Sequence, residues 1–297
     1  MNGVLLINKP KEFTSFDVVA VVRKYSGQRK IGHTGTLDPN ATGVLPLLLG
    51  NATKAQDIVP NHDKEYIADF QLGKTTDTLD IWGQVLTENE SHVSKRDLEN
   101  TLEKFKGEIS QIPPMYSAVQ VNGKRLYDLA RKGIEVERES RIVTVYTLKL
   151  LDFDENSQRG KIQVACSKGT YIRTLIDDIG KSLGTGAVMT ALERTSACGY
   201  KIEDCVSLDD VKSLSEKGGL ESKIAPTESL FTNYPYVKVS DAQAKRFYNG
   251  GELDCTRTYL AKINPADGTI FRVKDRGDNF LGLGIVKEQQ LKIYKHF

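Results

Sequence analysis

Alternation of apolar and polar residues predicts several β-strands. In the clearest segment, residues 64–72, every second residue is apolar: Tyr66, Ala68, Phe70 and Leu72. A period of two is the pattern of a strand with one buried face. Shorter or less regular apolar patterns predict further strands at residues 3–7, 141–153 and 160–167.

Helical spacing combined with capping residues predicts the helices. Thr14 is followed three residues later by Asp17, and Ser207 is followed in the same way by Asp210. This spacing is the capping box that starts a helix. Apolar residues at helical spacing also predict an amphipathic helix at residues 94–105. Further helices are expected at residues 52–59, from Gly169–Thr170 with Arg173 in the first turn, and at residues 240–249.

The C-terminal sixty or so residues have a different pattern. After an expected hinge at residues 227–235, a strand and a short helix are followed by short alternating segments separated by glycines. This pattern predicts a small β-barrel. We therefore expect two domains, at residues 1–232 and 233–297.

Residues 111–132 combine turn signals, aromatic residues and basic residues. Asn122-Gly123 is a strong hairpin turn, and a helix is expected at residues 125–132, with Gly133 as its stop. Residues 120–133 hold four basic residues against one acidic residue, interleaved with Tyr127 and preceded by Tyr116. The composition suits an RNA-gripping flap. By composition alone, an ordinary surface hairpin and helix is a competing explanation.

The overall charge does not indicate a nucleic-acid partner. The formal net charge of the 297 residues is only +2. The basic excess lies at the two ends, because residues 1–54 hold seven Lys or Arg against three Asp or Glu, and residues 236–297 hold eleven against seven.

The four cysteines stand far apart, without the spacing of a zinc or redox motif. Without a signal segment or an apolar run that spans a bilayer, the sequence predicts a cytoplasmic protein with reduced thiols.

Residues 32–46 are the most constrained stretch, and they read GHTGTLDPNATGVLP. Asp38 stands at the centre, directly before Pro39. Locally, such an Asp is explained as a turn that bonds its own backbone. Read whole, however, the stretch resembles the signature loop of the TruB family of tRNA pseudouridine synthases.

Other segments resemble the same family. They are NKPKEFTSFDVV at residues 8–19, KEYIADFQLGKTTDTLDIWG at 64–83, CSKGTYIRTLIDDIG at 166–180 and VMTALERTS at 188–196. Residues 111–132 resemble the insertion of stand-alone TruB enzymes, and the C-terminal segment resembles their PUA-like RNA-binding unit. The resemblance implies an α+β fold: a mixed, largely antiparallel sheet with flanking helices, carrying an insertion at about 108–135 and a PUA-like barrel.

The resemblance also implies roles for individual residues. Asp38 is the catalytic carboxylate, Arg173 pairs with it, and Tyr66 stacks on the target base. His33 fills the gap left in the RNA, Leu192 lies against the base, and Lys9 is scaffold. By pattern alone, Tyr66 and Leu192 are core residues and His33 is a loop residue that bonds backbone. Further substrate contacts are expected from Tyr171, Lys64, Arg29, Lys30, Lys124, Arg125 and Arg131. Asp77 and Asp80 are expected to shape a loop without a metal.

The implied reaction converts the T-loop uridine of tRNA, at position 55, into pseudouridine. The base must leave its stack. No redox change occurs and no group is imported, so neither cofactor nor metal is expected. Asp38 acts on C1′, on C6 or on the 2′ proton; the sequence leaves these routes open. The expected partner is the tRNA T-arm, bound by a monomer without a protein partner or membrane. Two alternatives are a guide-RNA-dependent relative and a non-catalytic tRNA-binding or chaperone protein.

Overall fold

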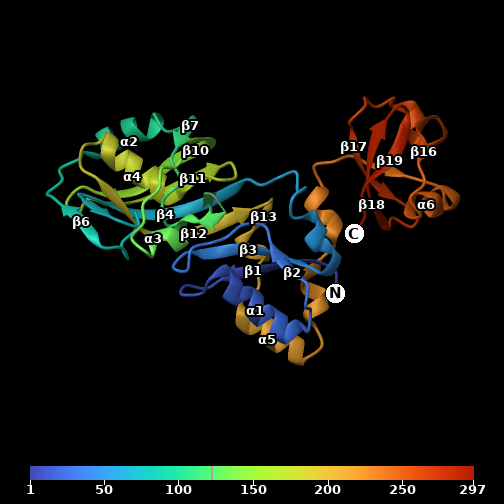
Figure 1. Ribbon diagram of the computed structural model, residues 1–297, viewed down its shortest axis with the longest axis horizontal. Helices are drawn as coiled ribbons and strands as arrows, with labels where there is room; N and C mark the ends of the chain where they lie inside the picture. Colours follow the sequence, from blue (N-terminus) through green and yellow to red (C-terminus); the bar gives the residue numbers. More distant parts are fainter. Residues whose placement is uncertain (122) are drawn as a thin grey trace.

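The computed structural model describes residues 1–121 and 123–297. Most strands join one large mixed sheet (Figure 1). Its strands are β1 (Gly3–Lys9), β2 (Ile31–His33), β3 (Thr42–Leu49), β4 (Lys64–Leu72), β7 (Gly107–Gln111), β10 (Arg141–Asp154), β11 (Arg159–Cys166), β12 (Ala187–Ala197), β13 (Tyr200–Lys201) and β14 (Ile224–Ala225). They lie in the order β14-β1-β3-β12-β4-β11-β10-β7, with β2 beside β3 and β13 beside β12. Most neighbours are antiparallel, whereas β3 and β12 pair in parallel.

Helices cover the large sheet in two groups. The α-helices among the described residues are α1 (Ser15–Ser26), α2 (Lys95–Glu103), α3 (Leu126–Ala130), α4 (Ile172–Ser182), α5 (Leu208–Glu216) and α6 (Asp241–Tyr248). Helices α1 and α5 lie side by side against β1 and β3, while α2 and α4 lie over the part of the sheet that contains β4 and β11 (Figure 1). The predicted core of mixed, largely antiparallel sheet with flanking helices is therefore confirmed.

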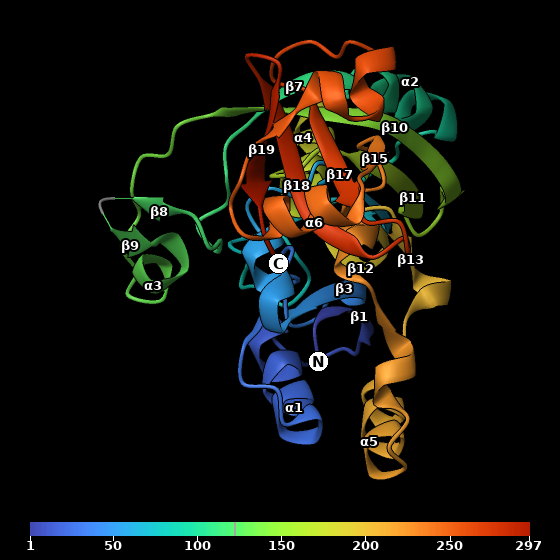
Figure 2. The same ribbon diagram turned by 90° about the vertical axis from the view of Figure 1, so that its right-hand side faces the viewer.

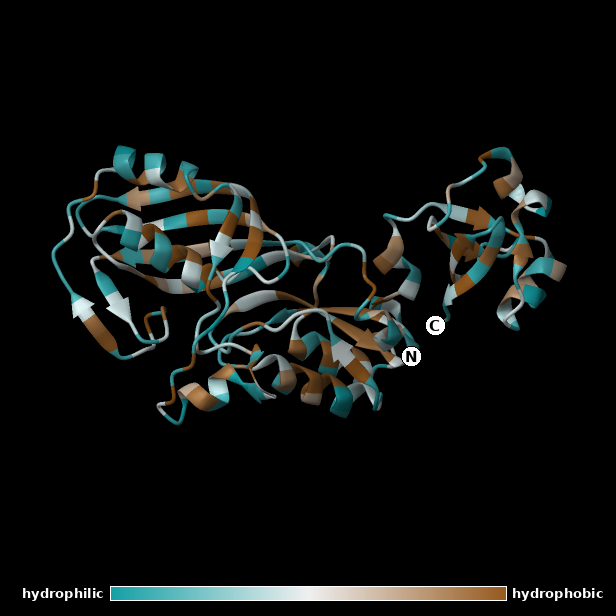
Figure 3. Cartoon of the chain, turned by 45° about the horizontal axis from the view of Figure 1, so that its top comes forward, coloured by the Kyte–Doolittle hydropathy of each residue, from teal (hydrophilic) through white to brown (hydrophobic). Residues whose placement is uncertain are grey.

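Local sequence accounts for the element boundaries. Strand β4 has the predicted bounds, and its four apolar positions are buried. Figure 3 shows the corresponding alternation of hydrophilic and hydrophobic residues along the strands. Both predicted capping boxes are present, at the start of α1 and of α5. Such local signals act within one turn of chain, so they survive in the folded molecule.

Three predicted helices were wrong in their bounds. Helix α4 starts at Ile172, because Gly169 takes a left-handed φ of +86° and the Thr170 hydroxyl donates to the Ser167 carbonyl, which makes a turn. Arg173 still lies in the first turn of α4. The helix expected at residues 52–59 is a 3-10 helix, η1 (Gly50–Ala55). Helix α3 is shorter than the expected 125–132.

The C-terminal residues form a second, curled sheet with its own apolar core. Its strands are β15 (Tyr236–Lys238), β16 (Leu253–Asp254), β17 (Ile270–Lys274), β18 (Phe280–Lys287) and β19 (Gln290–Lys295), in the order β15-β17-β18-β19-β16. Phe247 of α6 is fully buried among apolar residues of this sheet. The arrangement agrees with the PUA-like unit that the sequence led us to expect.

The connection between the two sheets is packed. The 3-10 helix η4 (Thr227–Phe231) occupies part of the expected hinge, and the Phe231 ring is fully buried. Its centroid lies 5.2 Å from that of Phe297 and 6.4 Å from that of Phe280. The expected hinge is thus filled by an aromatic cluster.

The remaining strands form two small hairpins, β5 (Lys74–Thr76) with β6 (Val85–Glu88), and β8 (Gln120–Val121) with β9 (Lys124–Arg125). Figure 2 shows β8, β9 and α3 standing out from the large sheet, as an insertion would. Asn122, the first residue of the predicted hairpin turn, lies outside the described residues. Within the described part of the chain, none of the helices has the length and apolar character needed to cross a membrane.

Candidate active site

Hydrogen bonds from Lys9 and Ser15 hold the loop that carries Asp38 in place. Lys9 is fully buried, and its Nζ donates to the carbonyls of Pro10, Phe13 and Pro39 at 2.9, 2.6 and 3.0 Å. The buried Ser15 hydroxyl accepts from the backbone N–H of Leu37 at 2.9 Å. Asp38 therefore stands between two anchored residues, and its side chain keeps 41% of its exposure.

Arg194 anchors the same loop from the sheet. Its side chain is fully buried; Nε donates to the Val44 carbonyl at 2.7 Å and Nη2 to the Gly35 carbonyl at 3.1 Å. Strands β3 and β12 approach so closely here that a Cβ on Gly43, whose φ is +103°, would lie 2.2 Å from the Arg194 carbonyl oxygen. Sequence analysis missed this residue. The available signal was its position two residues after Leu192, on the inward face of an alternating strand.

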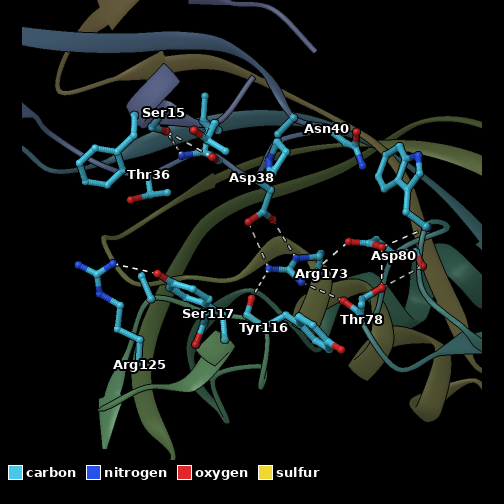
Figure 4. A pocket seen from close by; sticks show the side chains of 18 of the residues that line it. Ser15, Thr36, Asp38, Asn40, Thr78, Asp80, Tyr116, Ser117, Arg125 and Arg173 are labelled. Carbon is cyan, nitrogen blue, oxygen red and sulfur yellow. Dashed lines mark hydrogen bonds and ion pairs between the residues drawn. The ribbon is translucent and has the colours of Figure 1, made fainter. Parts of the chain in front are cut away.

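Arg173 holds the Asp38 carboxylate side-on. Its Nε lies 2.9 Å from Oδ2 and its Nη2 lies 3.3 Å from Oδ1. Two further donors bind the carbonyls of Thr78 at 2.9 Å and Tyr116 at 2.8 Å (Figure 4). One guanidinium thus joins the loop that carries Asp38, the β5–β6 hairpin and the insertion, which a planar fork of five N–H groups can do.

Asp80 is a second carboxylate beside this guanidinium. Its Oδ1 accepts from the Thr78 hydroxyl at 2.6 Å and from the Trp82 backbone N–H at 3.2 Å, and its Oδ2 lies 3.9 Å from Nη1 of Arg173. Burial raises the pKa of Asp80, although its hydrogen bonds with Thr78 and Trp82 and the positive charge of Arg173 act to lower it. Asp77 accepts from the Gln84 backbone N–H at 2.7 Å. Both residues shape the turn, as expected, and Asp80 also faces Arg173.

Tyr66 and Leu192 lie with Asp38 around one cavity, which we call the Tyr66 cavity. Its volume is about 370 Å³. Tyr66 is 6% exposed, and burial raises the pKa of its phenol to about 12, so the ring is neutral at physiological pH. Leu192 is 8% exposed. Both residues are core residues that also contact the cavity, so the pattern-based and resemblance-based interpretations are compatible.

Lys64 and Tyr171 line the Tyr66 cavity as well. The Lys64 ammonium donates to the His62 carbonyl at 2.7 Å, and burial lowers its pKa, with a further lowering by Arg194. Tyr171 is held by its backbone N–H, which donates to Gln111 at 2.9 Å. Arg29 and Lys30 are exposed, and they line neither the Tyr66 cavity nor the second cavity at Asp38, which is described next. The structure therefore does not bring this basic pair to the site.

Asp38 also lines a larger cavity of about 670 Å³, which we call the insertion cavity. His33 lines it, with its ring 5.8 Å from that of Phe16 in an edge-on arrangement. Burial lowers the pKa of His33, and the positive charge of Arg194 lowers it further. Its buried Nδ1 has no hydrogen-bond partner among the described residues.

The insertion supplies the other wall of this cavity. Arg125 and Arg131 both line it, and they lie 5.8 and 5.6 Å from the ring centroid of Tyr127. Arg125 also donates to the Tyr127 hydroxyl at 2.9 Å. Lys124 lies instead in an adjoining hollow of the insertion, exposed to solvent. Two cations around one aromatic ring, beside the candidate carboxylate, suit a nucleic-acid strand.

Comparison with family models identifies two consecutive matches. Residues 23–172 match the model described as TruB family pseudouridylate synthase (N terminal domain), and residues 173–232 match that described as tRNA pseudouridylate synthase B C-terminal domain.

Curated relatives extend the similarity to the whole chain. A protein of Clostridium tetani named tRNA pseudouridine synthase B is 44% identical over 296 residues, which is 99% of each chain. Its namesake in Fusobacterium nucleatum is 53% identical over 203 residues, 68% of this chain and 70% of the relative. Among solved structures, a chain from a Cbf5-Nop10-Gar1 complex covers 99% of this chain and 84% of its own length, with a TM-score of 0.74 and 26% identity.

This fold and these similarities together define the class of protein: it is a pseudouridine synthase, which is an isomerase. The chain belongs to the TruB family of tRNA pseudouridine synthases.

Proposed function

We propose that this chain isomerises the T-loop uridine at position 55 of tRNA to pseudouridine, with Asp38 as the catalytic carboxylate. The observation that carries the proposal is the Arg173–Asp38 pair at the junction of two cavities, with the phenol of Tyr66 on one side. The established family supplies the reaction class, and this geometry supports the assignment of the residues.

The reaction is balanced without an imported group. The bond from N1 of the uracil to C1′ breaks, the base turns, and a bond from C5 to C1′ forms. The hydrogen on C5 leaves as a proton, and N1 gains one, so no electrons are gained or lost overall. Asp38 acts on C1′, on C6 or on the 2′ proton, and each route requires a carboxylate held at a fixed point against the sugar and base.

The other residues have binding roles in this proposal. The flipped uracil enters the Tyr66 cavity, stacks on Tyr66 and packs against Leu192, which offsets part of the cost of unstacking. His33 occupies the space that the base leaves in the RNA. Tyr171 and Lys64 complete the cavity walls, and Arg125 and Arg131 hold the strand from the insertion. Lys124, Arg29 and Lys30 lie outside the two cavities and are left with contacts to more distant phosphates.

The proposal also divides the chain by task. Residues 1–232 form the catalytic domain, with the insertion at about 108–135, and residues 233–297 form an RNA-binding PUA-like domain. The separate apolar core of the C-terminal sheet supports this division. We further propose that the enzyme acts as a monomer in the cytoplasm, where its tRNA substrate is found, without a protein partner.

The test is release of tritium from a T-arm hairpin labelled at C5 of uracil. Wild-type protein should release the label, and carbodiimide mapping of a full tRNA transcript should place the pseudouridine at position 55. Asp38→Asn should lose at least about a thousandfold in rate and still bind the hairpin. Asp152→Asn, which changes an exposed carboxylate on β10, is the matched control and should keep wild-type release. Tight binding without release by the wild type would overturn the proposal in favour of a binding protein or a guide-dependent enzyme.

A further inference from the structure

The tryptophan at position 82 is the only one in the chain, and it is 42% exposed. A large aromatic ring usually gains stability by burial. Here, the ring stands at the edge of the insertion cavity, which also contains Asp38. The proposed roles of the site residues leave Trp82 without a function.

A tight turn fixes the backbone beneath this ring. The backbone N–H of Trp82 donates to Oδ1 of Asp80 at 3.2 Å, and that of Ile81 donates to the Met189 carbonyl at 2.9 Å. The next residue, Gly83, leaves no room for a side chain, because a Cβ would lie 2.2 Å from the Thr78 hydroxyl. Because Asp80 also faces Arg173 at 3.9 Å, Trp82 is held at a fixed position relative to the catalytic pair.

Trp82 lines two hollows. One is the insertion cavity, and the other is a cavity of about 240 Å³ that also contains Lys11 and Lys161. Asn40, two residues after Asp38, lines both hollows. A strand that passes from Asp38 over Asn40 into the smaller hollow therefore meets the indole ring.

A cation accompanies the ring. The ammonium of Lys11 lies 5.5 Å from the centroid of the Trp82 ring. The smaller hollow also contains Asp69 and Glu193, but Asp69 is already paired with Lys161 at 3.4 Å. The hollow is thus nearly neutral, so it does not attract phosphate as a basin of charge. Its distinctive features are one flat aromatic surface and one adjacent cation, the combination on which single-stranded bases stack.

We propose that Trp82 and Lys11 form a stacking site for an RNA base that neighbours the target uridine. The ring takes the face of the base, and Lys11 meets the phosphate of the same nucleotide. The inference rests on the proposed function for the identity of the RNA, and it assigns a substrate contact outside the residues already given a role there.

The single tryptophan makes the first test direct, because all tryptophan emission comes from Trp82. A T-arm hairpin is titrated into Asp38→Asn protein, so that binding is measured without turnover. Stacking should quench the emission by about half or more and protect the ring from acrylamide. Unchanged emission at RNA concentrations that saturate binding, measured independently by anisotropy of a labelled hairpin, would overturn the proposal.

A second test separates stacking from simple proximity. Trp82→Leu should raise KM about tenfold with little change in kcat, whereas Trp82→Phe, which keeps a flat ring, should stay within about threefold of wild type. Lys11→Gln should lower the slope of log K against log salt by about 0.7. Lys24→Gln, which removes a lysine near the Tyr25 ring at the far end of α1, is the matched control and should leave the slope unchanged.

The outcomes distinguish the two proposals. Quenching and a raised KM support the stacking site, and equal affinity of Trp82→Leu and wild type contradicts it even where activity is normal. Absence of tritium release by wild-type protein, with quenching intact, contradicts the proposed reaction and leaves the stacking site standing. The comparison of variants requires that Trp82→Leu and Trp82→Phe have equal melting temperatures. If Trp82→Leu is unstable, the quenching measured with Asp38→Asn protein, which keeps Trp82, decides.

Discussion

Nε of Arg173 lies 2.9 Å from Oδ2 of Asp38, although 134 residues separate the two in sequence (Figure 4). The same guanidinium binds two backbone carbonyls from other loops, and its side chain is 5% exposed. Asp38 is consequently oriented by a group that is itself held on several sides. In the proposed reaction, this geometry makes the exact shape of the cation, and not only its charge, important.

Replacement of Arg173 by lysine tests this point. A lysine keeps the charge but cannot bind both carboxylate oxygens and two carbonyls from one plane. We expect Arg173→Lys to lower the single-turnover rate of tritium release about a hundredfold, because small misplacement of a reacting group has a cost of this size. Hairpin affinity should stay within about threefold. Arg96→Lys, the same exchange at an exposed position of α2, is the control and should match wild type. A rate for Arg173→Lys within threefold of wild type would refute the role of the planar guanidinium.

Arg194 is expected to contribute to stability as well as to activity. Its fully buried guanidinium binds the carbonyls of Val44 and Gly35, so Arg194→Met leaves buried acceptors without donors. We expect a loss of about 2–4 kcal/mol in the free energy of unfolding, measured by urea denaturation, and slower catalysis, because Gly35 lies in the loop of Asp38. Arg159→Met, at an exposed position of β11, is the control. Equal urea midpoints for Arg194→Met and wild type would show that the anchor is dispensable.

Structural features that depend on residues close together in the sequence could be predicted, whereas those that depend on distant residues could not. The capping boxes at Thr14 and Ser207 depend on residues three apart, and both were predicted from sequence and are present. The approach of Arg173 to Asp38 depends on the whole sheet, so only the family resemblance suggested it. Even the start of α4 was displaced, because Gly169 adopts a left-handed conformation that a periodicity argument does not detect.

Arg194 is a residue of the candidate site whose role could not be predicted from the sequence. Its inward position was readable from alternation with Leu192, but a charged residue in a strand is usually assigned to the solvent. Its partners are carbonyls of β3 and of the Asp38 loop, more than a hundred residues away in sequence. The contacts of Trp82 with two cavities are likewise a product of tertiary structure. Such residues become visible only when burial and partners are known.

The insertion should contribute electrostatic affinity for RNA. Arg131 lies 5.6 Å from the Tyr127 ring centroid and lines the insertion cavity. We expect Arg131→Gln to weaken hairpin binding and to lower the slope of log K against log salt by about 0.7–0.9, the contribution of one phosphate contact. Arg96→Gln should leave the slope unchanged. An unaltered slope in Arg131→Gln, measured by anisotropy over a range of salt concentrations, would place the strand elsewhere.

The half-buried histidine at the end of β2 provides a pH-dependent prediction. His33 lines the insertion cavity, its Nδ1 lacks a partner among the described residues, and burial together with Arg194 lowers its pKa below the ordinary 6.5. Below that value, the unfolded chain binds a proton at this position that the folded chain does not bind. Stability therefore rises with pH in this window; the contribution of His33 is complete above pH 6.5 and is lost as the pH falls through the lower pKa of the folded state.

Replacement of His33 by phenylalanine should remove this contribution. Urea midpoints measured at about pH 7.5, 6.5 and 5.5 should fall less steeply for His33→Phe than for wild type, because the variant has no proton to bind at residue 33. His62→Phe is a positive control, since burial lowers the pKa of His62 too. Parallel pH dependence in wild type and His33→Phe would mean that this imidazole titrates equally in the folded and unfolded chains. A shallower dependence would instead support a neutral ring at physiological pH, which is the form suited to fill an apolar gap between RNA bases.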